Sequence, residues 1–329
     1  MAEQPRVLER LIARRAELAA ALAGASPTGI VIVARGSSDY AAIFGRYLLE
    51  AATGLPVALA APSLQTIYDV APRVDGWLAI GVSQSGRTPE IATVLERFGA
   101  GGARTVAITN DAASPLAQLA DVPVALEAGD ERAVPATKTF TAQLAAMAIV
   151  AEAIGALDWS GDDWAGVPAA VAGVLADAAP AERAAERLGE AGDLVVVGRG
   201  LLLCVALETA LKLREASGVR AEGWSAADFR HGPMTVARGT LPLLAVSAHG
   251  PAEADVAELA RELGEAGTPV QRLADDPAAE LPYPGRELPE AFRALPAVVR
   301  AQQLAFALAV RRGVDPDSPP GLRKVTPTT

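Results

Sequence analysis

The chain has 329 residues, 51% of them hydrophobic, and a formal net charge of −10. This length allows two domains with cores of their own, and the negative charge argues against nucleic-acid binding. The longest apolar stretch, residues 144–157, is interrupted by Glu152, so no segment predicts a membrane span. With one cysteine, Cys204, and a charged N-terminus that lacks the features of a secretory signal, the protein is expected to be soluble and cytoplasmic.

The predicted elements begin with an amphipathic helix within residues 1–24. After it, short continuous apolar runs alternate with helical patterns, as in a parallel sheet covered on both faces. The pattern occurs twice, and residues 159–192 between the two series contain a linker and a helix. The first series predicts strands at 29–34, 56–60, 77–82, 104–109 and 122–126, and the second at 193–198, 219–222, 241–246 and 268–273, with a short edge strand after them.

The two halves are related by an internal duplication. Residues 30–38 (IVIVARGSS) align with residues 194–202 (LVVVGRGLL) at an offset of 164. The same offset, without a gap, pairs two further stretches with their counterparts, 50–57 with 214–221 and 78–86 with 242–250. Chance similarity between sequences rich in alanine and valine is the alternative, but glycine and serine also fall in register. We therefore predict two copies of one α/β domain.

A cluster of hydroxyls follows the third predicted strand. Its members are Ser83, Gln84, Ser85 and Thr88 of SQSGRT, and the second half has SAHGPA at the aligned positions. Such a turn before a helix offers backbone N–H groups, side-chain donors and the positive end of the helix dipole, which together suit a phosphate dianion.

Ser37 and Ser38 follow the first predicted strand and would lie at the same edge of the sheet. The alternative is that Ser85 or Thr88 only caps the helix that begins near Pro89. A cap requires one hydroxyl, whereas this turn has three. The pattern therefore favours a phosphate site.

Ionisable residues are found in the second half instead. Glu208, Lys212 and Glu215 recur at i, i+4 and i+7 of the predicted helix LETALKLRE. A solvated face of ion pairs is the common explanation for this spacing. His231 follows in a loop and has the side chain best suited to proton transfer near neutral pH, although an incidental loop histidine is the alternative.

A third candidate is GDERAVPATKTFTAQL, residues 129–144, where Thr137, Lys138 and Thr139 begin a predicted long helix. An N-cap is the simplest explanation for these residues. Because the segment follows the last strand of the first half, we also expect its first turn to form a wall of the phosphate pocket.

Four motifs together resemble the sugar isomerase (SIS) domain pair of glucosamine-6-phosphate synthase and of stand-alone aminosugar-phosphate deaminases. In chain order they are SQSGRTPE, AGDERAVPATKTFTAQL, ALETALKLREASGVRAEGWSAADFRHGP and GLRKVT. The resemblance covers nearly the whole chain from about residue 25. It implies two tandem SIS domains, each a three-layer αβα sandwich with a mainly parallel five-stranded sheet, usually in a homodimer. The expected organisation is an N-terminal helix at 1–24, SIS domain 1 at 25–158, a linker and helix at 159–192, SIS domain 2 at 193–315 and a tail at 316–329 that reaches the active site.

The resemblance also implies residue roles. Glu215 would be the base that moves a proton between C1 and C2, and Lys212 would assist at the open-chain carbonyl. His231, from the partner subunit, would open the pyranose ring, and Lys324 would reach the sugar carbonyl. The implied sugar-phosphate site comprises Ser38, Ser83, Gln84, Ser85 and Thr88, with backbone contacts to the sugar from Val134 and Ala136.

These roles imply an aminosugar-phosphate deaminase/isomerase that converts glucosamine 6-phosphate into fructose 6-phosphate and ammonia. Neither a metal-ligand cluster nor a dinucleotide fingerprint is recognisable, so no cofactor is expected. Met1 stands shortly before the first predicted strand, which leaves no room for a glutaminase domain and predicts independence of glutamine. Arg87 and Pro135 depart from the synthase-like motifs, and KVTPTT resembles the ending of the deaminases. The alternatives are an aldose/ketose isomerase, a deaminase for another hexosamine or a fructosamine phosphate, or a sensor that binds sugar phosphate without turnover.

Overall fold

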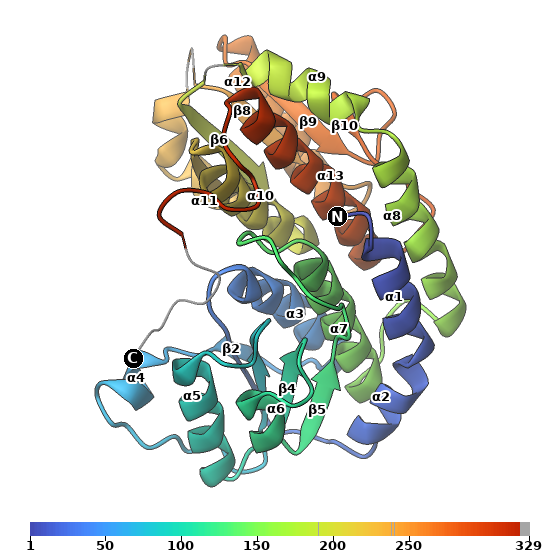
Figure 1. Cartoon of the computed structure of the whole chain (residues 1–329), viewed down its shortest axis with the longest axis vertical. Coiled ribbons are helices and arrows are strands. Elements are labelled where there is room, and N and C mark those ends of the chain that lie inside the picture. The colour runs from blue at the N-terminus through green and yellow to red at the C-terminus, as the bar shows by residue number, and fades with distance from the viewer. Residues whose placement is uncertain (190, 238, 240, 323–329) are drawn as a thin grey trace. The chain divides into compact units, whose positions relative to one another are not determined.

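The computed structural model describes residues 1–189, 191–237, 239 and 241–322 (Figure 1). These residues form two compact units. The N-terminal unit comprises residues 6–131 and 138–160, and the C-terminal unit comprises residues 1–5, 132–137 and 161–322.

The N-terminal unit is built on a parallel five-stranded sheet in the order β2-β1-β3-β4-β5. Its strands are β1 (Ile30–Val33), β2 (Val57–Leu59), β3 (Leu78–Val82), β4 (Arg104–Thr109) and β5 (Val122–Ala125). Its helices are α2 (Arg15–Leu22), α3 (Ser37–Thr53), α4 (Ser63–Thr66), α5 (Pro89–Ala100), α6 (Pro115–Leu119) and α7 (Lys138–Ile154), and α1 (Gln4–Ala13) begins the chain.

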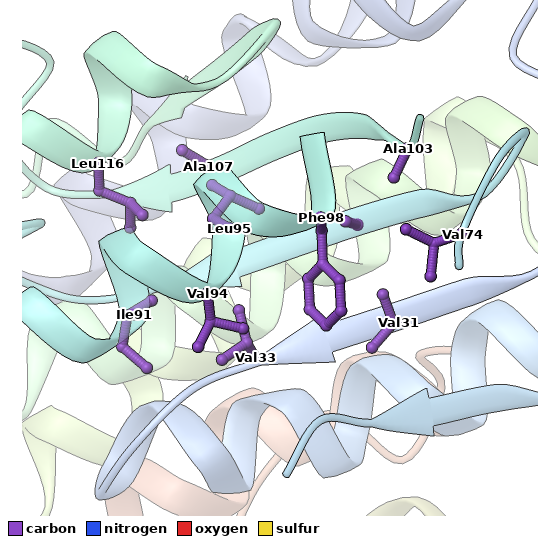
Figure 2. Packing of buried hydrophobic residues seen from close by; sticks show 11 residues of the cluster. Val31, Val33, Val74, Ile91, Val94, Leu95, Phe98, Ala103, Ala107 and Leu116 are labelled. Atoms are coloured by element: carbon purple, nitrogen blue, oxygen red, sulfur yellow. The ribbon is translucent and has the colours of Figure 1, made fainter. Parts of the chain in front are cut away.

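Both faces of this sheet are covered, as the continuous apolar runs predict. Figure 2 shows α5 packed on one face, where its Phe98 lies in the same cluster as Val31 and Val33 of β1. Side chains alternate along a strand, so Ile30 and Ile32 point to the opposite face. They are fully buried as well. A strand buried on both sides contains no polar alternation, which explains the sequence pattern.

The C-terminal unit has a second parallel five-stranded sheet, in the order β10-β9-β8-β6-β7. Its strands are β6 (Asp193–Gly198), β7 (Arg220–Ser225), β8 (Leu243–Val246), β9 (Val270–Ala274) and β10 (Leu281–Pro282). Its helices are α8 (Val167–Ala176), α9 (Ala179–Leu188), α10 (Leu203–Ser217), α11 (Ala226–Arg230), α12 (Glu253–Glu265) and α13 (Glu290–Arg311), with short 3₁₀ turns η1 (Gly161–Gly166), η2 (Gly200–Leu202) and η3 (Pro233–Ala237).

The predicted fold class is confirmed, and the structure retains the duplication. Read from its other edge, the second sheet has the strand order of the first. The helix after the first strand ends in both units at a left-handed glycine, Gly54 with φ 69° and Gly218 with φ 68°. A residue with a Cβ is strained in that conformation, so the two glycines stop α3 and α10 at equivalent places.

Two helical segments are divided more finely than their patterns suggest. The N-terminal segment forms α1 and α2, separated at Arg14, whose guanidinium pairs with Glu127 at 2.8 Å. Residues 159–192 contain η1, α8 and α9, and α8 ends at Asp177, which has an extended backbone, just before Pro180 in the first turn of α9. Proline suits the first turn of a helix and cannot continue a preceding one.

In the described part of the chain, no single helix is long and apolar enough to cross a membrane. One bent pair, residues 161–176 with 179–188, meets the length and composition criterion together, as buried helices of a folded core also do.

Candidate functional site

The predicted phosphate turn, residues 83–88, connects the carboxyl end of β3 to the first residue of α5. Two backbone hydrogen bonds tie it to the neighbouring β4, since the Ser83 N–H donates to the Ile108 carbonyl at 3.1 Å and the Gln84 carbonyl accepts from the Asn110 N–H at 3.0 Å. The turn is therefore part of the sheet edge and is held by it.

Gly86 is the one position of this turn that requires glycine. Its φ is +61°, and a Cβ built there would lie 2.1 Å from the Ser114 Oγ. Both the conformation and the space exclude a side chain. The close approach lets the Gly86 carbonyl accept the Leu116 N–H at 3.1 Å, which fixes the turn against α6.

Two hydroxyls of the turn, those of Ser83 and Thr88, lie close to each other. Ser83 Oγ lies 3.3 Å from Thr88 Oγ1 and also accepts the Gly86 N–H at 3.2 Å, while Ser85 Oγ accepts the Arg87 N–H at 3.2 Å. Thr88 occupies the N-cap position of α5, yet its side chain makes no capping hydrogen bond. Helix capping therefore does not account for the hydroxyl cluster, and the first turn of α5 is not closed by Thr88.

The corresponding turn of the C-terminal unit is closed by an internal carboxylate. There the His249 N–H donates to both oxygens of Asp275, at 2.9 and 3.1 Å. Asp275 is buried and lies 3.4 Å from the Arg293 guanidinium, which also donates to the His249 carbonyl. The backbone donor that an anion would use is thus already occupied in this unit. In the N-terminal unit the aligned residue, Asp111, instead pairs with Arg87 at 2.9 Å on the surface.

Ser38 lies in the first turn of α3, after β1, which pairs directly with β3. Arg35, in the loop after β1, donates to both oxygens of Glu90 in the first turn of α5 at 2.9 and 3.0 Å. The C-terminal unit has an equivalent pair, Arg199 with Asp255 at 3.2 Å, although it lacks the hydroxyl cluster. In each unit the pair thus connects the loop after the first strand to the helix that follows the third strand.

The segment before α7 contains a residue that sequence reasoning missed. The carboxylate of Glu131, which is buried, accepts the Thr139 N–H at 2.9 Å and the Thr139 hydroxyl at 2.7 Å. A carboxylate at a helix N-terminus satisfies a free N–H and interacts favourably with the helix dipole. Glu131 stands eight residues before its partner, outside the spacing of a sequence-readable cap.

The sugar-contact residues Val134 and Ala136 lie between Glu131 and Lys138, in the stretch 132–137 that belongs to the C-terminal unit. The Val134 N–H donates to the Asp317 carbonyl of the same unit at 2.9 Å. The predicted phosphate residues therefore belong to one unit, and these two predicted sugar contacts belong to the other.

The charged stripe on α10 is buried, which excludes the explanation of a solvated ion-pair face. Glu208 is fully buried, Lys212 is 3% exposed, and the side chain of Glu215 is 24% exposed. The Lys212 ammonium pairs with Glu215 and lies 3.4 Å from Glu208 Oε1. Burial alone would lower the pKa of Lys212, but the two carboxylates outweigh it and raise the pKa above its ordinary value, so the residue stays an ammonium.

The contacts described above for Lys212 and Glu215 do not include His231. His231 is exposed just after α11, and its side chain makes no hydrogen bond with the residues the structure describes. Lys324 lies outside the described residues. The structure thus brings the hydroxyl residues together at one sheet edge of the N-terminal unit, and Lys212 with Glu215 on one helix of the C-terminal unit.

The family model of the SIS domain matches residues 25–153 and 187–281, which include the hydroxyl turn and the α10 stripe. The chain belongs to the SIS domain family. The chain is similar in sequence and fold to a candidate phosphosugar isomerase of Silicibacter pomeroyi DSS-3. The two are 34% identical, with a TM-score of 0.83 over 96% of this chain and 98% of that one.

Two further similar proteins differ in how much of their own length this chain covers. The glutamine–fructose-6-phosphate aminotransferase (isomerizing) of Gloeobacter violaceus is 34% identical over 90% of this chain but only 51% of its own length. The chain thus spans about half the length of the curated relatives it matches. A glucosamine-6-phosphate deaminase of Thermotoga maritima shares the fold, with a TM-score of 0.75 at 23% identity over 98% of this chain and 99% of that one.

Proposed function

We propose that this SIS protein is a sugar-phosphate isomerase for aminosugars, and more specifically a deaminase that turns glucosamine 6-phosphate into fructose 6-phosphate and ammonia. The observation that carries the proposal is the buried ion pair of Lys212 with Glu215 on α10. A cation and a carboxylate held together on one helix are the groups that a proton transfer next to a carbonyl requires, whereas a protein that only bound its sugar would not need them.

The hydroxyl turn supplies the binding end. Ser83, Ser85 and Thr88 present three hydroxyls beside the first turn of α5, whose N-cap side chain makes no capping bond. Backbone N–H groups, hydroxyls and the helix dipole together stabilise a phosphate dianion without a lysine. Gln84, the fourth member of the turn, and Ser38, at the neighbouring strand end, add further polar groups to the same sheet edge.

The reaction follows from the two ionisable residues. In the open-chain aldehyde, Glu215 removes the proton from C2 and returns it to C1, while the Lys212 ammonium stabilises the charge that develops on oxygen. The aldehyde oxygen takes up a proton to become the C1 hydroxyl, the amine nitrogen gives one up, and the product is an imine at C2. Water adds to the imine, the water oxygen becomes the C2 carbonyl, and the nitrogen leaves as ammonia. Because its raised pKa keeps Lys212 protonated at neutral pH, Lys212 serves as a donor and Glu215 as the base.

Three further roles complete the proposal. The chain would act as a homodimer in which the exposed His231 enters the partner's site and opens the pyranose ring. Val134 and Ala136 would contact the sugar through their backbones, and Lys324 would reach its carbonyl. The His231 ring is exposed and has no hydrogen-bond partner among the described residues, which supports its role, since a residue used across an interface needs no partner in its own chain.

The names of relatives support a substrate of this class. The aminotransferase relatives are named for fructose 6-phosphate, and the deaminase that shares the fold is named for glucosamine 6-phosphate. A simple aldose/ketose isomerase is the second candidate, favoured by the candidate phosphosugar isomerase that matches nearly the whole chain. The same base and cation serve both reactions, so the fate of the nitrogen distinguishes them.

Two incubations test the proposal. In the first, the purified protein receives glucosamine 6-phosphate, and in the second it receives fructose 6-phosphate with glutamine; ammonia, fructose 6-phosphate and glutamate are measured in both. We expect ammonia and fructose 6-phosphate in equal amounts from the first and no glutamate from the second. Glutamate in the second would contradict glutamine independence. If neither incubation yields a product but the protein interconverts an aldose phosphate and a ketose phosphate in a separate assay, the second candidate is favoured.

A further inference from the structure

The side chain of Gln143 is hydrogen-bonded to Ser38, one of the predicted phosphate-binding residues. Gln143 lies on α7, where it is 1% exposed, and its Nε2 donates to Ser38 Oγ at 3.0 Å. Ser38 itself is buried in the first turn of α3. The two residues are far apart in sequence and meet only in the folded N-terminal unit.

The direction of this hydrogen bond decides what Ser38 can do. A serine hydroxyl has one proton and two lone pairs. Since Gln143 donates, it occupies a lone pair of Ser38 and leaves the proton free. A phosphate dianion accepts hydrogen bonds and offers none, so a hydroxyl contributes to its binding only if its proton is available.

The carbonyl oxygen of the Gln143 amide, Oε1, takes no part in this hydrogen bond. It is buried and has no hydrogen-bond partner among the residues the structure describes. If the amide were turned, Oε1 would accept the Ser38 proton, and Ser38 would present only lone pairs to the ligand. An unpartnered buried acceptor is unfavourable, and here it accompanies the orientation that leaves the Ser38 proton free.

The internal duplication provides a comparison. At the position aligned with Ser38, the C-terminal unit has Leu202, which is buried and offers no hydroxyl. That unit is also the one whose turn is closed by Asp275. The oriented hydroxyl therefore occurs in the unit that has the hydroxyl turn, and it is absent from the unit whose turn Asp275 closes.

We infer that Gln143 is a positioning residue for phosphate recognition, which sets Ser38 as a hydrogen-bond donor to the 6-phosphate. The inference rests on the proposed phosphate site at residues 83–88. Gln143 acts through Ser38 and does not touch the ligand itself, so its effect on binding depends on Ser38 being present.

The test measures the affinity for fructose 6-phosphate by calorimetry in the wild type, Gln143→Met and Gln143→Glu, each also combined with Ser38→Ala. Gln143→Met removes the orienting donor and should weaken binding several-fold. Gln143→Glu places a permanent acceptor beside Ser38 and adds a negative charge near the phosphate, so it should weaken binding by about tenfold or more. In the Ser38→Ala background, Gln143→Met should have no further effect on affinity, because the mediating hydroxyl is gone.

Gln271→Met is the matched control. Gln271 is also a buried glutamine with one hydrogen bond, to the Ala184 carbonyl at 3.3 Å, and a buried Oε1 without a partner in the described structure, but it lies on β9 of the C-terminal unit. Its replacement should leave the affinity unchanged. Thermal unfolding of every variant identifies any that do not fold, and if Gln143→Glu is one of them, Gln143→Met and its cycle with Ser38→Ala decide the matter.

The results distinguish a failure of the Gln143 role from a failure of the proposed phosphate site. If the wild type binds fructose 6-phosphate and folded Gln143→Met binds equally well, the inference is wrong while the phosphate site stands. An equal loss with and without Ser38 would likewise reduce Gln143 to a packing residue. If the wild type binds no hexose 6-phosphate at all, the proposed site fails, and the role of Gln143 fails with it.

Discussion

Lys212 and Glu215 form a buried ion pair three residues apart on α10, and Glu208 approaches the same ammonium to 3.4 Å from the preceding turn. One cation thus interacts with two carboxylates in a place where water is largely excluded. The fully buried carboxylate, Glu208, holds the lysine from one side, and the other carboxylate, Glu215, is partly exposed to solvent.

Lys212→Met should therefore reduce both activity and stability. Removing one member of a buried charge pair leaves its partners without compensation, which costs about 3 to 5 kcal/mol of unfolding free energy. The control is Arg220→Met, which removes an exposed pair with Asp193 and should change the unfolding free energy by less than about 1 kcal/mol. Urea unfolding measures both. Similar losses in the two variants would show that the α10 pair is not buried in solution.

The same pair predicts a pH dependence of stability. The pKa of Lys212 is raised in the folded protein above the ordinary 10.5, so its stabilising contribution is fully present below about pH 10.5. As the pH rises further, the unfolded chain loses this proton before the folded protein does, and the contribution decreases. The stability difference between wild type and Lys212→Met, measured by urea unfolding, should hence shrink as the pH rises above about 10.5. A difference that grows above that pH would contradict the assignment.

Ser83→Ala combined with Ser85→Ala should weaken the binding of hexose 6-phosphates and leave the fold intact. Each lost charge-assisted hydrogen bond corresponds to about 1.5 to 3 kcal/mol of binding free energy. Ser247→Ala is the matched control, because Ser247 is aligned with Ser83 in the turn that Asp275 closes. Calorimetry should find normal affinity for this control. Unchanged affinity in the double variant would reduce the hydroxyl turn to a structural element.

Gly86→Ala and Gly54→Ala should differ strongly although both glycines have positive φ. At Gly54 a Cβ meets nothing within 4 Å, so only the backbone strain of about 1 to 2 kcal/mol is expected. At Gly86 the added atom collides with Ser114 and Thr109, and overpacking adds about 1 to 3 kcal/mol. Chemical denaturation compares them. Equal destabilisation would mean that the turn moves away from α6 without resistance.

His231 can be tested by complementation between subunits. An inactive His231→Ala chain mixed with an inactive Glu215→Gln chain should recover activity, because one of the two sites in a mixed dimer then contains both groups. Random exchange forms such dimers half of the time, so about one quarter of the wild-type activity is expected. Exchange is verified with differently tagged chains. Verified mixed dimers without activity would place both residues in one chain's site or remove His231 from the chemistry.

The fold was largely predictable because burial on both faces leaves a direct trace in sequence. All five strands of the N-terminal unit start and end within one residue of the apolar runs that predicted them. The largest departure is in the C-terminal unit, where β7, expected to end at Glu222, continues to Ser225. Gly223 and Trp224 do not extend the apolar pattern, but they pair with Val196 and Val197 of β6, so the neighbouring strand determines their structure.

The site was less predictable, since its decisive properties depend on tertiary contacts. Glu208, Lys212 and Glu215 have the same spacing whether α10 is solvated or buried, and only its packing against α13 and β7 distinguishes the two cases. Glu131 and Gln143 were not identified as functional because their partners, Thr139 and Ser38, cannot be inferred from local spacing. The closed turn around Asp275 likewise depends on Arg293, which lies on α13, well separated from Asp275 in sequence.

The most direct measurement of the central claim is ammonia release from glucosamine 6-phosphate by the wild type and by Glu215→Gln, with ligand binding determined for both. The account predicts ammonia and fructose 6-phosphate in a one-to-one ratio from the wild type. In Glu215→Gln it predicts a rate lower by a factor of about 10² to 10⁴ with binding retained, because a positioned base contributes that much to a proton transfer. Ammonia release at the wild-type rate in Glu215→Gln would contradict the account.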